Sequence, residues 1–180
     1  MGDRDYKIHD DHYPYFITSS LRFGLPLFNN PKAAEIILEN LNFLQNERDV
    51  RLTAYIIMEN HLHIILQGDD LAQKFGQFKS YSARKIIDLL KAHQRSRWLK
   101  RLKMVKQEFK TDQDFQLWEE RFQPKRIIGD KMMLQKIYYI HQNPVKRGYV
   151  GKAEHWRYSS ARNYAGDKGL IPVELFRGCS

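Results

Sequence analysis

Two apolar segments separated by only two polar residues constrain the fold of this chain more than any other feature. Residues 50–58 (VRLTAYIIM) and 61–67 (HLHIILQ) have the apolar, β-branched character that predicts strands. The intervening Glu59-Asn60 is long enough only for a tight turn, so the two strands must be antiparallel and form a hairpin. The chain is therefore expected to fold around an antiparallel sheet.

The segments around this hairpin predict one more strand and two helices. Residues 13–23 are rich in β-branched and aromatic side chains and predict a strand. Residues 32–46 place apolar side chains at helical spacing, and Pro31 suits the first turn of that helix. Residues 71–93 predict a long amphipathic helix. Its buried face is expected to contain Leu71, Phe75, Phe78, Ile86 and Leu89 or Leu90.

The second half of the chain completes the pattern. Residues 115–128 contain strand-like pieces that Pro124 is expected to stop, and 130–143 predict a helix that ends before Pro144. The basic segment 94–112 fits either a helix or a loop. The order strand, helix, strand, strand, helix, strand, helix predicts an α+β fold, with a ferredoxin-like (split βαβ) antiparallel sheet. Helices are expected on one face of this sheet, in addition to the C-terminal helix.

Length and composition predict one folded domain. The chain has 180 residues, 42% of them hydrophobic, which suffices for a single core over residues 1–180. The polar residues 1–12 are expected to form a flexible tail. No apolar run reaches the length of a membrane span, and no secretory signal is present at the N-terminus. The single Cys179 excludes an intrachain disulfide and fits a reducing compartment, so a cytoplasmic protein is expected.

The formal net charge of +9 is concentrated in one segment. Between Lys74 and Lys110 the chain has twelve Lys or Arg and two acidic residues, and the remaining residues carry nearly equal numbers of each sign. A solvated helix face is the simplest interpretation, but aromatic residues such as Tyr81 and Trp98 alternate with the cations. That mixture favours a single-stranded nucleic acid, whose bases stack and whose phosphates pair. The residues expected to contact it are Lys74, Lys79, Arg84, Lys85, Arg95, Arg97, Lys100 and Arg101.

Two histidines in the predicted hairpin are the first candidates for chemistry. Side chains alternate along a strand, so His61 and His63 share one face while Leu62 and Ile64 point to the other. The apolar set is expected to face the core. The imidazoles would then lie side by side on the opposite face, about 7 Å apart at Cα, and could reach one metal ion. A pair of histidines with purely structural partners is an equal alternative at this point.

A metal site would need a further ligand, and the helix at 130–143 offers one. Tyr139 and Asn143 are four residues apart and therefore lie on one helix face. The Asn143 amide oxygen suits a hard cation. Taken alone, a packing tyrosine and an asparagine at a helix end explain the same residues, so both interpretations stay open.

Four segments taken together carry a family resemblance: HLH, WEERFQPKRI, YYIHQNPVKRGYV and HWRYSSARNYAG. They resemble the HUH-type single-tyrosine transposases, in particular the REP-associated tyrosine transposases, over about Tyr15 to Tyr164. In that family a His-hydrophobe-His lies on a central strand of a ferredoxin-like sheet. A later helix carries the nucleophilic tyrosine and, four residues on, an amide or acidic metal ligand, typically within YIHxNPV. Tyr139-Ile-His-Gln-Asn143-Pro-Val matches that pattern.

The resemblance implies a function and a set of roles. Tyr139 would attack single-stranded DNA near a hairpin and form a 5′-phosphotyrosine link, which is later rejoined to another strand. His61, His63 and Asn143 would hold a divalent metal, Mg²⁺ or Mn²⁺, that polarises the scissile phosphate. The partner would be single-stranded DNA with hairpin structure. The sequence assigns no general base and leaves a monomer and a homodimer as alternatives.

One position departs from the family, and three rival functions are left. Glu59 stands where the family often has proline. Its carboxylate could alter the metal preference or be harmless turn surface, and harmless turn surface is expected. A replication-initiator or relaxase-like nickase would share the same site. A non-catalytic module could read RNA through exposed aromatic rings on a sheet, although this strand offers histidines where such rings would be needed. A zinc hydrolase is least favoured, because the chain lacks HExxH spacing.

Overall fold

The computed structural model describes residues 8, 10, 12–104, 115–120 and 123–178. Its centre is a four-stranded sheet with the order β2-β3-β1-β4, in which every neighbouring pair is antiparallel. The strands are β1 (Tyr15–Ser20), β2 (Arg51–Ile57), β3 (His61–Gln67) and β4 (Gln123–Arg126). This order and the strand directions are those of the split βαβ arrangement, so the predicted α+β fold is confirmed.

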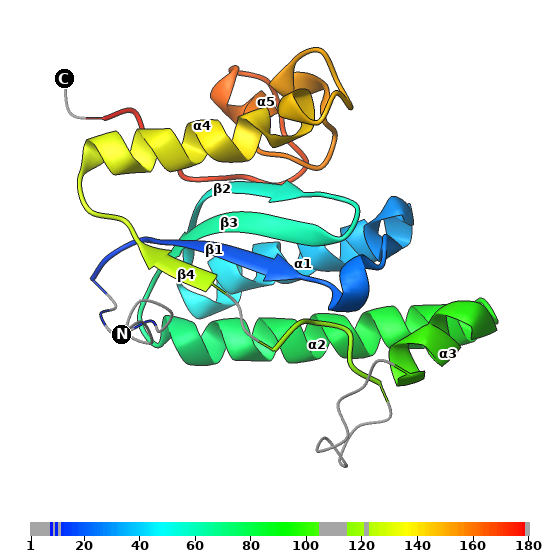
Figure 1. Ribbon diagram of the computed structural model, residues 1–180. Helices are drawn as coiled ribbons and strands as arrows, with labels where there is room; N and C mark the ends of the chain where they lie inside the picture. The colour runs from blue at the N-terminus through cyan, green and yellow to red at the C-terminus, as the bar shows by residue number, and fades with distance from the viewer. Residues whose placement is uncertain (1–7, 9, 11, 105–114, 121–122, 179–180) are drawn as a thin grey trace, which may run out of the picture.

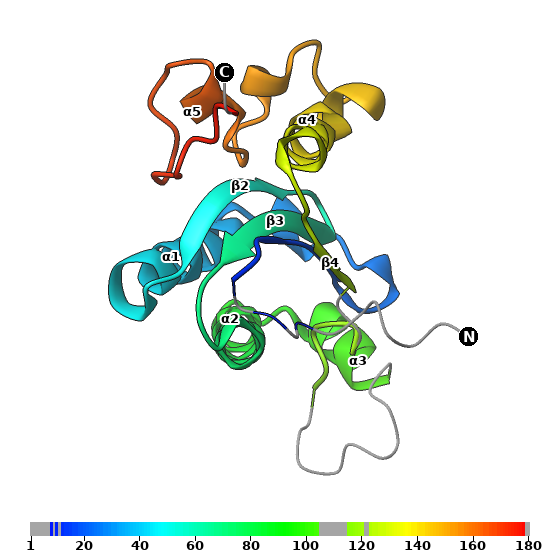
Figure 2. The ribbon, with the colours of Figure 1, turned by 90° about the vertical axis from the view of Figure 1, so that its left-hand side faces the viewer.

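Helices cover both faces of this sheet. Figures 1 and 2 show α1 and α2 against one face and α4 against the other, so the molecule has three layers. The helices are α1 (Pro31–Arg48), α2 (Leu71–Ala92), α3 (Ser96–Met104), α4 (Asp130–Lys146) and α5 (Ala161–Tyr164). Short 3-10 turns occur at η1 (Arg22–Gly24), η2 (Leu27–Asn29) and η3 (Ala153–His155). None of the helices in the described part of the chain is long and apolar enough to cross a membrane.

The hairpin forms as the sequence predicts. Ile57 pairs with Leu62, and the amide of Met58 donates to the carbonyl of His61 at 2.8 Å, which closes a tight turn over Glu59-Asn60. β3 lies between β2 and β1, so the two histidines lie at the start of a central strand. The helix prediction at 32–46 is confirmed as well, because Pro31 begins α1.

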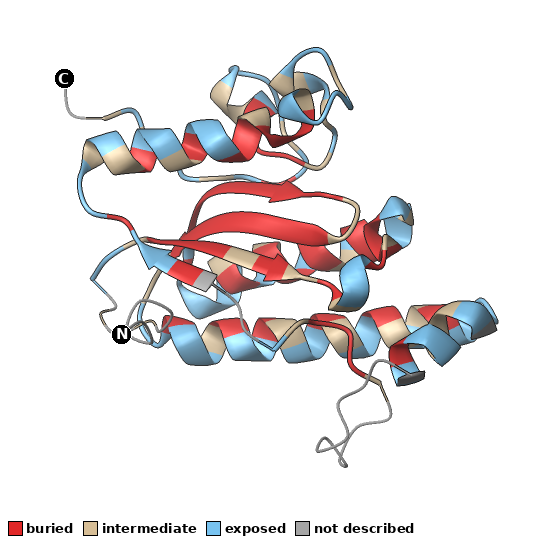
Figure 3. Ribbon diagram, in the orientation of Figure 1, coloured by how far each residue is buried: buried red, intermediate tan, exposed pale blue. Residues whose placement is uncertain are grey.

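The side chains of β3 alternate between two hydrophobic clusters. Leu62, Ile64 and Leu66 pack with apolar residues of α1 and α2 in the larger cluster. Ile65 lies in the second cluster, between the sheet and α4. Figure 3 shows the consequence: β2 and β3 are largely buried between the helices, whereas the edge strand β4 is partly exposed. The expected burial of the α2 stripe is confirmed, and Ser82 also belongs to it.

Two predictions based on proline were wrong. Pro124 does not stop a strand but lies within β4, opposite Ile17. β4 is an edge strand, where the missing amide hydrogen of proline is tolerated. Pro144 does not end the last long helix, because α4 continues to Lys146 and the amide of Arg147 still donates to Asn143 O at 3.2 Å. Proline removes only its own hydrogen bond near a helix end, so one further turn can form.

The basic segment and the tail are described in part. Residues 96–104 form α3, so this portion of 94–112 is helical, whereas residues 105–114 lie outside the described residues. Of the expected flexible tail at 1–12, residues 1–7, 9 and 11 also lie outside them. The prediction of a flexible tail therefore stays a prediction.

Candidate active site between β3 and α4

The predicted histidine pair lies on the face of β3 that α4 covers. His61 is 8% exposed and His63 is 5% exposed. Their ring centroids are 4.9 Å apart and the rings meet edge to face. The expected side-by-side arrangement of the two imidazoles on the face opposite the α1–α2 core is thus what the structure shows.

A hydrogen bond fixes the orientation of each imidazole. Asn60 donates through Nδ2 to the carbonyl of Gly24 at 3.3 Å, so its Oδ1 faces Nδ1 of His61 at 2.6 Å. Because an amide oxygen can only accept, His61 carries its proton on Nδ1 and presents the lone pair of Nε2. Nδ1 of His63 lies 2.8 Å from the hydroxyl of Thr18. Outer partners of this kind hold metal-binding histidines in place.

Burial keeps both imidazoles neutral. Burial is the main cause of the lowered pKa of His61. The positive charge of Arg147 lowers this pKa further, and the negative charge of Glu59 raises it. Burial also lowers the pKa of His63 to about 3, with smaller contributions from His61, Arg147 and Lys136. A neutral imidazole is the form that binds a metal, so the site needs no proton release from these rings at pH 7.

Tyr139 of α4 lies directly against this pair. Its ring centroid is 5.3 Å from that of His63 and 5.7 Å from that of Phe16, which itself stacks on His63. The Tyr139 side chain is still 42% exposed, so its hydroxyl can be reached from solvent. The neighbouring Tyr138 is 60% exposed, and Lys146 lies over its ring at 5.9 Å from the centroid. The structure therefore brings Tyr139, and not its neighbour, to the histidines.

Asn143 follows Tyr139 by one helical turn and is 8% exposed. Its side-chain oxygen Oδ1 is buried without a hydrogen-bond partner among the described residues. Burying an acceptor in this way is costly unless something else satisfies it. An oxygen of this kind, on the helix that carries Tyr139, is what a hard cation would use.

The donor set fits a divalent metal. Within the described parts of the chain, no group of three or more His, Cys, Asp or Glu side chains could hold one, so a third protein ligand must be of another type. The Asn143 oxygen, which has no hydrogen-bond partner among the described residues, is a candidate of that type, on the same helix as Tyr139. Two nitrogen ligands and one oxygen ligand leave positions open for water or a phosphate, as in catalytic metal sites.

The sequence did not single out two cations near the histidines, and it assigned Glu59 a different role from the one in the structure. Lys136 of α4 lies over the ring of Phe16, which itself stacks on His63. Arg147 is the residue that caps the C-terminal end of α4. Both charges help to lower the pKa of His63. Glu59 accepts hydrogen bonds from Arg147 Nη1 at 3.1 Å and from the hydroxyl of Tyr149 at 3.2 Å. Its side chain is only 19% exposed, so it is not the harmless turn surface that was expected.

A sequence signal for these cations existed. Residues 123–162 contain nine Lys or Arg and only two acidic residues, a second basic segment hidden by the acidic residues elsewhere. Arg147 also lies four residues after Asn143, so the spacing that joined Tyr139 to Asn143 extends by one more step.

The eight cations predicted to contact nucleic acid lie in another layer. All eight belong to α2, α3 and the turn between them, on the face of the sheet opposite α4 (Figure 2). Six of the eight are exposed: Arg84, Lys85, Arg95, Arg97, Lys100 and Arg101. Lys79 is partly buried and donates to the carbonyl of Glu119 at 2.8 Å, so it holds the chain after α3 in place. The structure thus does not bring these cations to the histidines.

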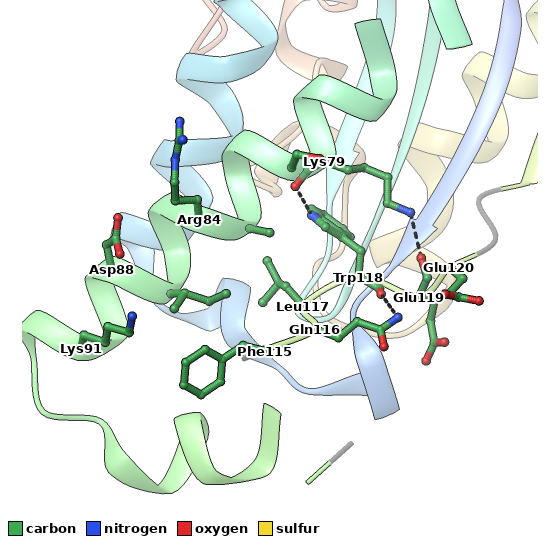
Figure 4. Close-up of a pocket in the computed structure, with 13 residues that line it drawn as sticks. Lys79, Arg84, Asp88, Lys91, Phe115, Gln116, Leu117, Trp118, Glu119 and Glu120 are labelled. Carbon is green, nitrogen blue, oxygen red and sulfur yellow. Dashed lines mark hydrogen bonds between the residues drawn. The ribbon is translucent and has the colours of Figure 1, made fainter. Parts of the chain in front are cut away.

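A groove of about 580 Å³ lies along α2 on that second face. Figure 4 shows it between α2 and residues 115–120, with Trp118 donating from its indole to the carbonyl of Lys79. Lys79, Arg84 and Lys91 line it, but so do Asp88, Glu119 and Glu120. The mixed charges do not favour a phosphate there, so we place the chemistry between β3 and α4 and not in this groove.

Comparisons with known proteins bear on the same question. No protein-family model matches the sequence. Over 111 residues the chain is 27% identical to a protein of Haemophilus influenzae named "Putative REP-associated tyrosine transposase". The match covers 59% of this chain and 56% of that protein, so the chain spans about half the length of the curated relative it matches.

The fold comparison extends over nearly the whole chain. The structure matches that of a REP-associated tyrosine transposase bound to a REP hairpin with a TM-score of 0.66 and 18% identity, covering 98% of this chain and 92% of the other. The resemblance found in the sequence is confirmed. At this level of identity the structural match establishes the fold, and the roles of individual residues rest on the geometry described above.

Proposed function

We propose that this chain is a REP-associated tyrosine transposase, a DNA transposase that cleaves and rejoins single-stranded DNA. The observation that carries the proposal is the placement of Tyr139 against His63, with ring centroids 5.3 Å apart and the phenol open to solvent. The similarity in sequence and fold to proteins of that group supports it. A replication-initiator or relaxase-like nickase would use the same site, and the YIHxNPV context favours the transposase.

Tyr139 is proposed to be the nucleophile. Its phenolic oxygen attacks the phosphorus of the scissile phosphodiester, the bond from phosphorus to the 3′ oxygen breaks, and the 3′ oxygen leaves as a hydroxyl with a proton from solvent. The phenol gives up its own proton in the same step. The product is a 5′-phosphotyrosine that keeps the energy of the phosphodiester, so a second 3′-hydroxyl can reverse the attack and rejoin a strand without a nucleotide cofactor.

His61, His63 and Asn143 are proposed to hold a divalent metal, Mg²⁺ or Mn²⁺, which would polarise the scissile phosphate when bound. The protein's own contribution is to keep these groups in place before DNA arrives. Asn60 and Thr18 orient the imidazoles, and the helix that carries Asn143 packs on the sheet through Met133, Ile137 and Ile140. Groups that need no rearrangement at the moment of reaction stabilise a transition state most effectively.

We propose single-stranded DNA with hairpin structure as the partner. The solved relative in fold is described as bound to a REP hairpin. The exposed cations of α2 and α3 would contribute backbone contacts away from the site. A non-catalytic module that reads RNA is less well supported, because α4 covers the sheet face where stacking rings would have to be exposed.

The test is covalent capture. The full chain is incubated with Mg²⁺ or Mn²⁺ and a pool of single-stranded DNA hairpins whose flanking sequences are randomised, and protein–DNA adducts are resolved on a denaturing gel. We expect an adduct with wild type and with Tyr138→Phe, and none with Tyr139→Phe. No adduct from any hairpin would overturn the enzyme proposal, and an adduct that survives in Tyr139→Phe would show that the nucleophile is another residue.

A further inference from the structure

Arg147 occupies the end of α4 nearest the histidine pair. Tyr139, Asn143 and Arg147 follow one another at intervals of four residues, so they lie along one side of the helix. Its guanidinium donates to Glu59, which lies two residues before His61 in the hairpin that carries both histidines. A permanent positive charge therefore stands beside the place where the proposed reaction occurs.

The guanidinium is held in place by the hairpin that carries the histidines. Arg147 Nη1 donates to Glu59 Oε1 at 3.1 Å, and Glu59 lies two residues before His61. The same carboxylate oxygen accepts from the hydroxyl of Tyr149 at 3.2 Å. Tyr149 stacks on Trp156, whose indole donates to the carbonyl of Ile57 at the end of β2. The contacts thus form a closed loop from the hairpin to α4 and back to the hairpin.

The different exposures of Glu59 and Arg147 suit the guanidinium to binding an anion. The Glu59 side chain is 19% exposed, whereas that of Arg147 is 41% exposed. The carboxylate is therefore largely shielded and the guanidinium is open to solvent. Arginine has five donors in a planar fork, so a contact through one nitrogen leaves others for phosphate oxygens.

We propose that Arg147 is a catalytic residue that binds the scissile phosphate, and that Glu59 is the positioning residue that aims it. This inference rests on the proposed function. Charge builds up on the phosphate oxygens as the phosphorus is attacked, and a fixed cation beside them lowers the barrier. Glu59 acts only through Arg147, because its carboxylate would repel a phosphate if it were left unpaired.

The experiment measures the rate of covalent adduct formation with a hairpin captured by the wild-type chain. Under saturating DNA we expect Arg147→Gln to lower this rate roughly 100-fold. Arg147→Lys keeps the charge but loses the fork, and should recover part of the rate. The matched control is Arg51→Gln, which breaks an exposed pair with Glu174 (3.8 Å) away from the site and should leave the rate unchanged.

The role of Glu59 is read from a double-mutant comparison. Glu59→Gln alone should slow adduct formation about tenfold. It should have no further effect when Arg147 is already Gln, because both variants remove the same positioned guanidinium. Multiplicative effects would show that Glu59 acts by another route. Melting temperatures of all variants are measured together, and a rate loss restored by cooling below the melting transition would indicate a merely structural role.

The outcomes separate this inference from the proposed function. If wild type forms an adduct and Arg147→Gln forms it at a rate within twofold, the role of Arg147 is overturned and the transposase proposal stands. If wild type forms no adduct with any hairpin, the proposed function fails first. A split in which Arg147→Gln weakens binding of a plain oligothymidylate but not the rate at saturation would make Arg147 a binding residue only.

Discussion

The α4 face and the α2–α3 face of this molecule are both basic, but they are built differently. On the α4 face some cations lie near a fixed partner, as Arg147 does with Glu59 and Lys136 with the ring of Phe16. On the other face, most of the cations are exposed on the outer sides of the helices. The first face has buried imidazoles and a tyrosine beside them, which are the groups proposed to do the chemistry.

The difference shows that a high density of exposed charge and a set of fixed reactive groups indicate different functions. Exposed lysines and arginines give a long-range, salt-dependent attraction for a polyanion. Groups held by packing and hydrogen bonds give a defined geometry at one atom of the substrate. Because α2 and α4 lie on opposite faces of the sheet (Figure 2), a DNA strand that touches both must pass around an edge of the sheet. Variants on each face should therefore change different measurements.

The largest effect is expected from the histidine pair. His61→Ala and His63→Ala should each lower the rate of adduct formation by roughly 10³-fold, because the metal would lose a ligand and the phosphate its main source of polarisation. They should also remove any rise in melting temperature that Mn²⁺ produces in wild type. The control is His93→Ala, an exposed histidine at the end of α2. A Mn²⁺-dependent rise that persists in both variants would refute the metal assignment.

A comparison of the two core faces should give the next largest effect. Ile64 and Ile65 are adjacent, both 0% exposed, and point into different clusters. Truncation of either to Ala should cost about 2–5 kcal/mol of unfolding free energy in chemical denaturation. Only Ile65→Ala should also increase hydrogen exchange in α4 and slow adduct formation, since it lies under that helix. Equal exchange in α4 for both variants would show that the faces are not independent.

The exposed cations of α3 should have a smaller effect, and on affinity rather than rate. Arg97→Gln, Lys100→Gln and Arg101→Gln combined should weaken binding of single-stranded DNA about tenfold. If all three contact phosphates, the log–log slope of affinity against salt should fall by about 2, at roughly 0.7 per contact. The rate of adduct formation at saturating DNA should not change. An unchanged affinity would show that α3 does not bind the DNA. A lower rate at saturating DNA would show that α3 also contributes to the reaction.

The smallest effect is expected from acid. His141 is buried against Ser160 and α5, and burial lowers its pKa to about 4 from an ordinary value of 6.5. The unfolded chain therefore binds a proton that the folded chain does not, so the stability present above pH 6.5 is lost as the pH falls toward 4. In metal-free protein this one group should contribute at most about 1.4 kcal/mol per pH unit.

The check is a set of denaturation curves between pH 7 and pH 4. His141→Gln should remove the contribution of this one histidine to the loss of unfolding free energy with falling pH. The substitution also changes the hydrogen bond to Ser160. The matched control is His155→Gln, because His155 is exposed in η3. Hydrogen exchange should increase first in α4 and α5, since His61, His63 and His141 all lie on that side of the sheet. Earlier opening of α2 would contradict the comparison of faces.

Much of the fold was fixed by local patterns. The β2–β3 hairpin followed from two apolar runs and a two-residue gap, and α1 and α2 followed from their apolar spacing. The errors at Pro124 and Pro144 arose because proline was judged by its own missing hydrogen bond. Whether that bond is needed depends on the position of the strand in the sheet and on the distance to the end of the helix, and neither is a local property.

The site divides in the same way. The sequence by itself determined that His61 and His63 share a face and that Tyr139 and Asn143 share another, since the repeat of a strand or helix fixes which side chains align. Only the tertiary structure decided that Tyr139 packs against His63, that the Asn143 oxygen is buried without a hydrogen-bond partner among the described residues, and that Glu59 reaches Arg147 across 88 positions of the chain. It also decided that the most basic segment lies on the far side of the sheet. Contacts between distant segments depend on how the layers pack. The periodic pattern of one helix or strand shows which of its faces is buried, but not which other element packs against that face.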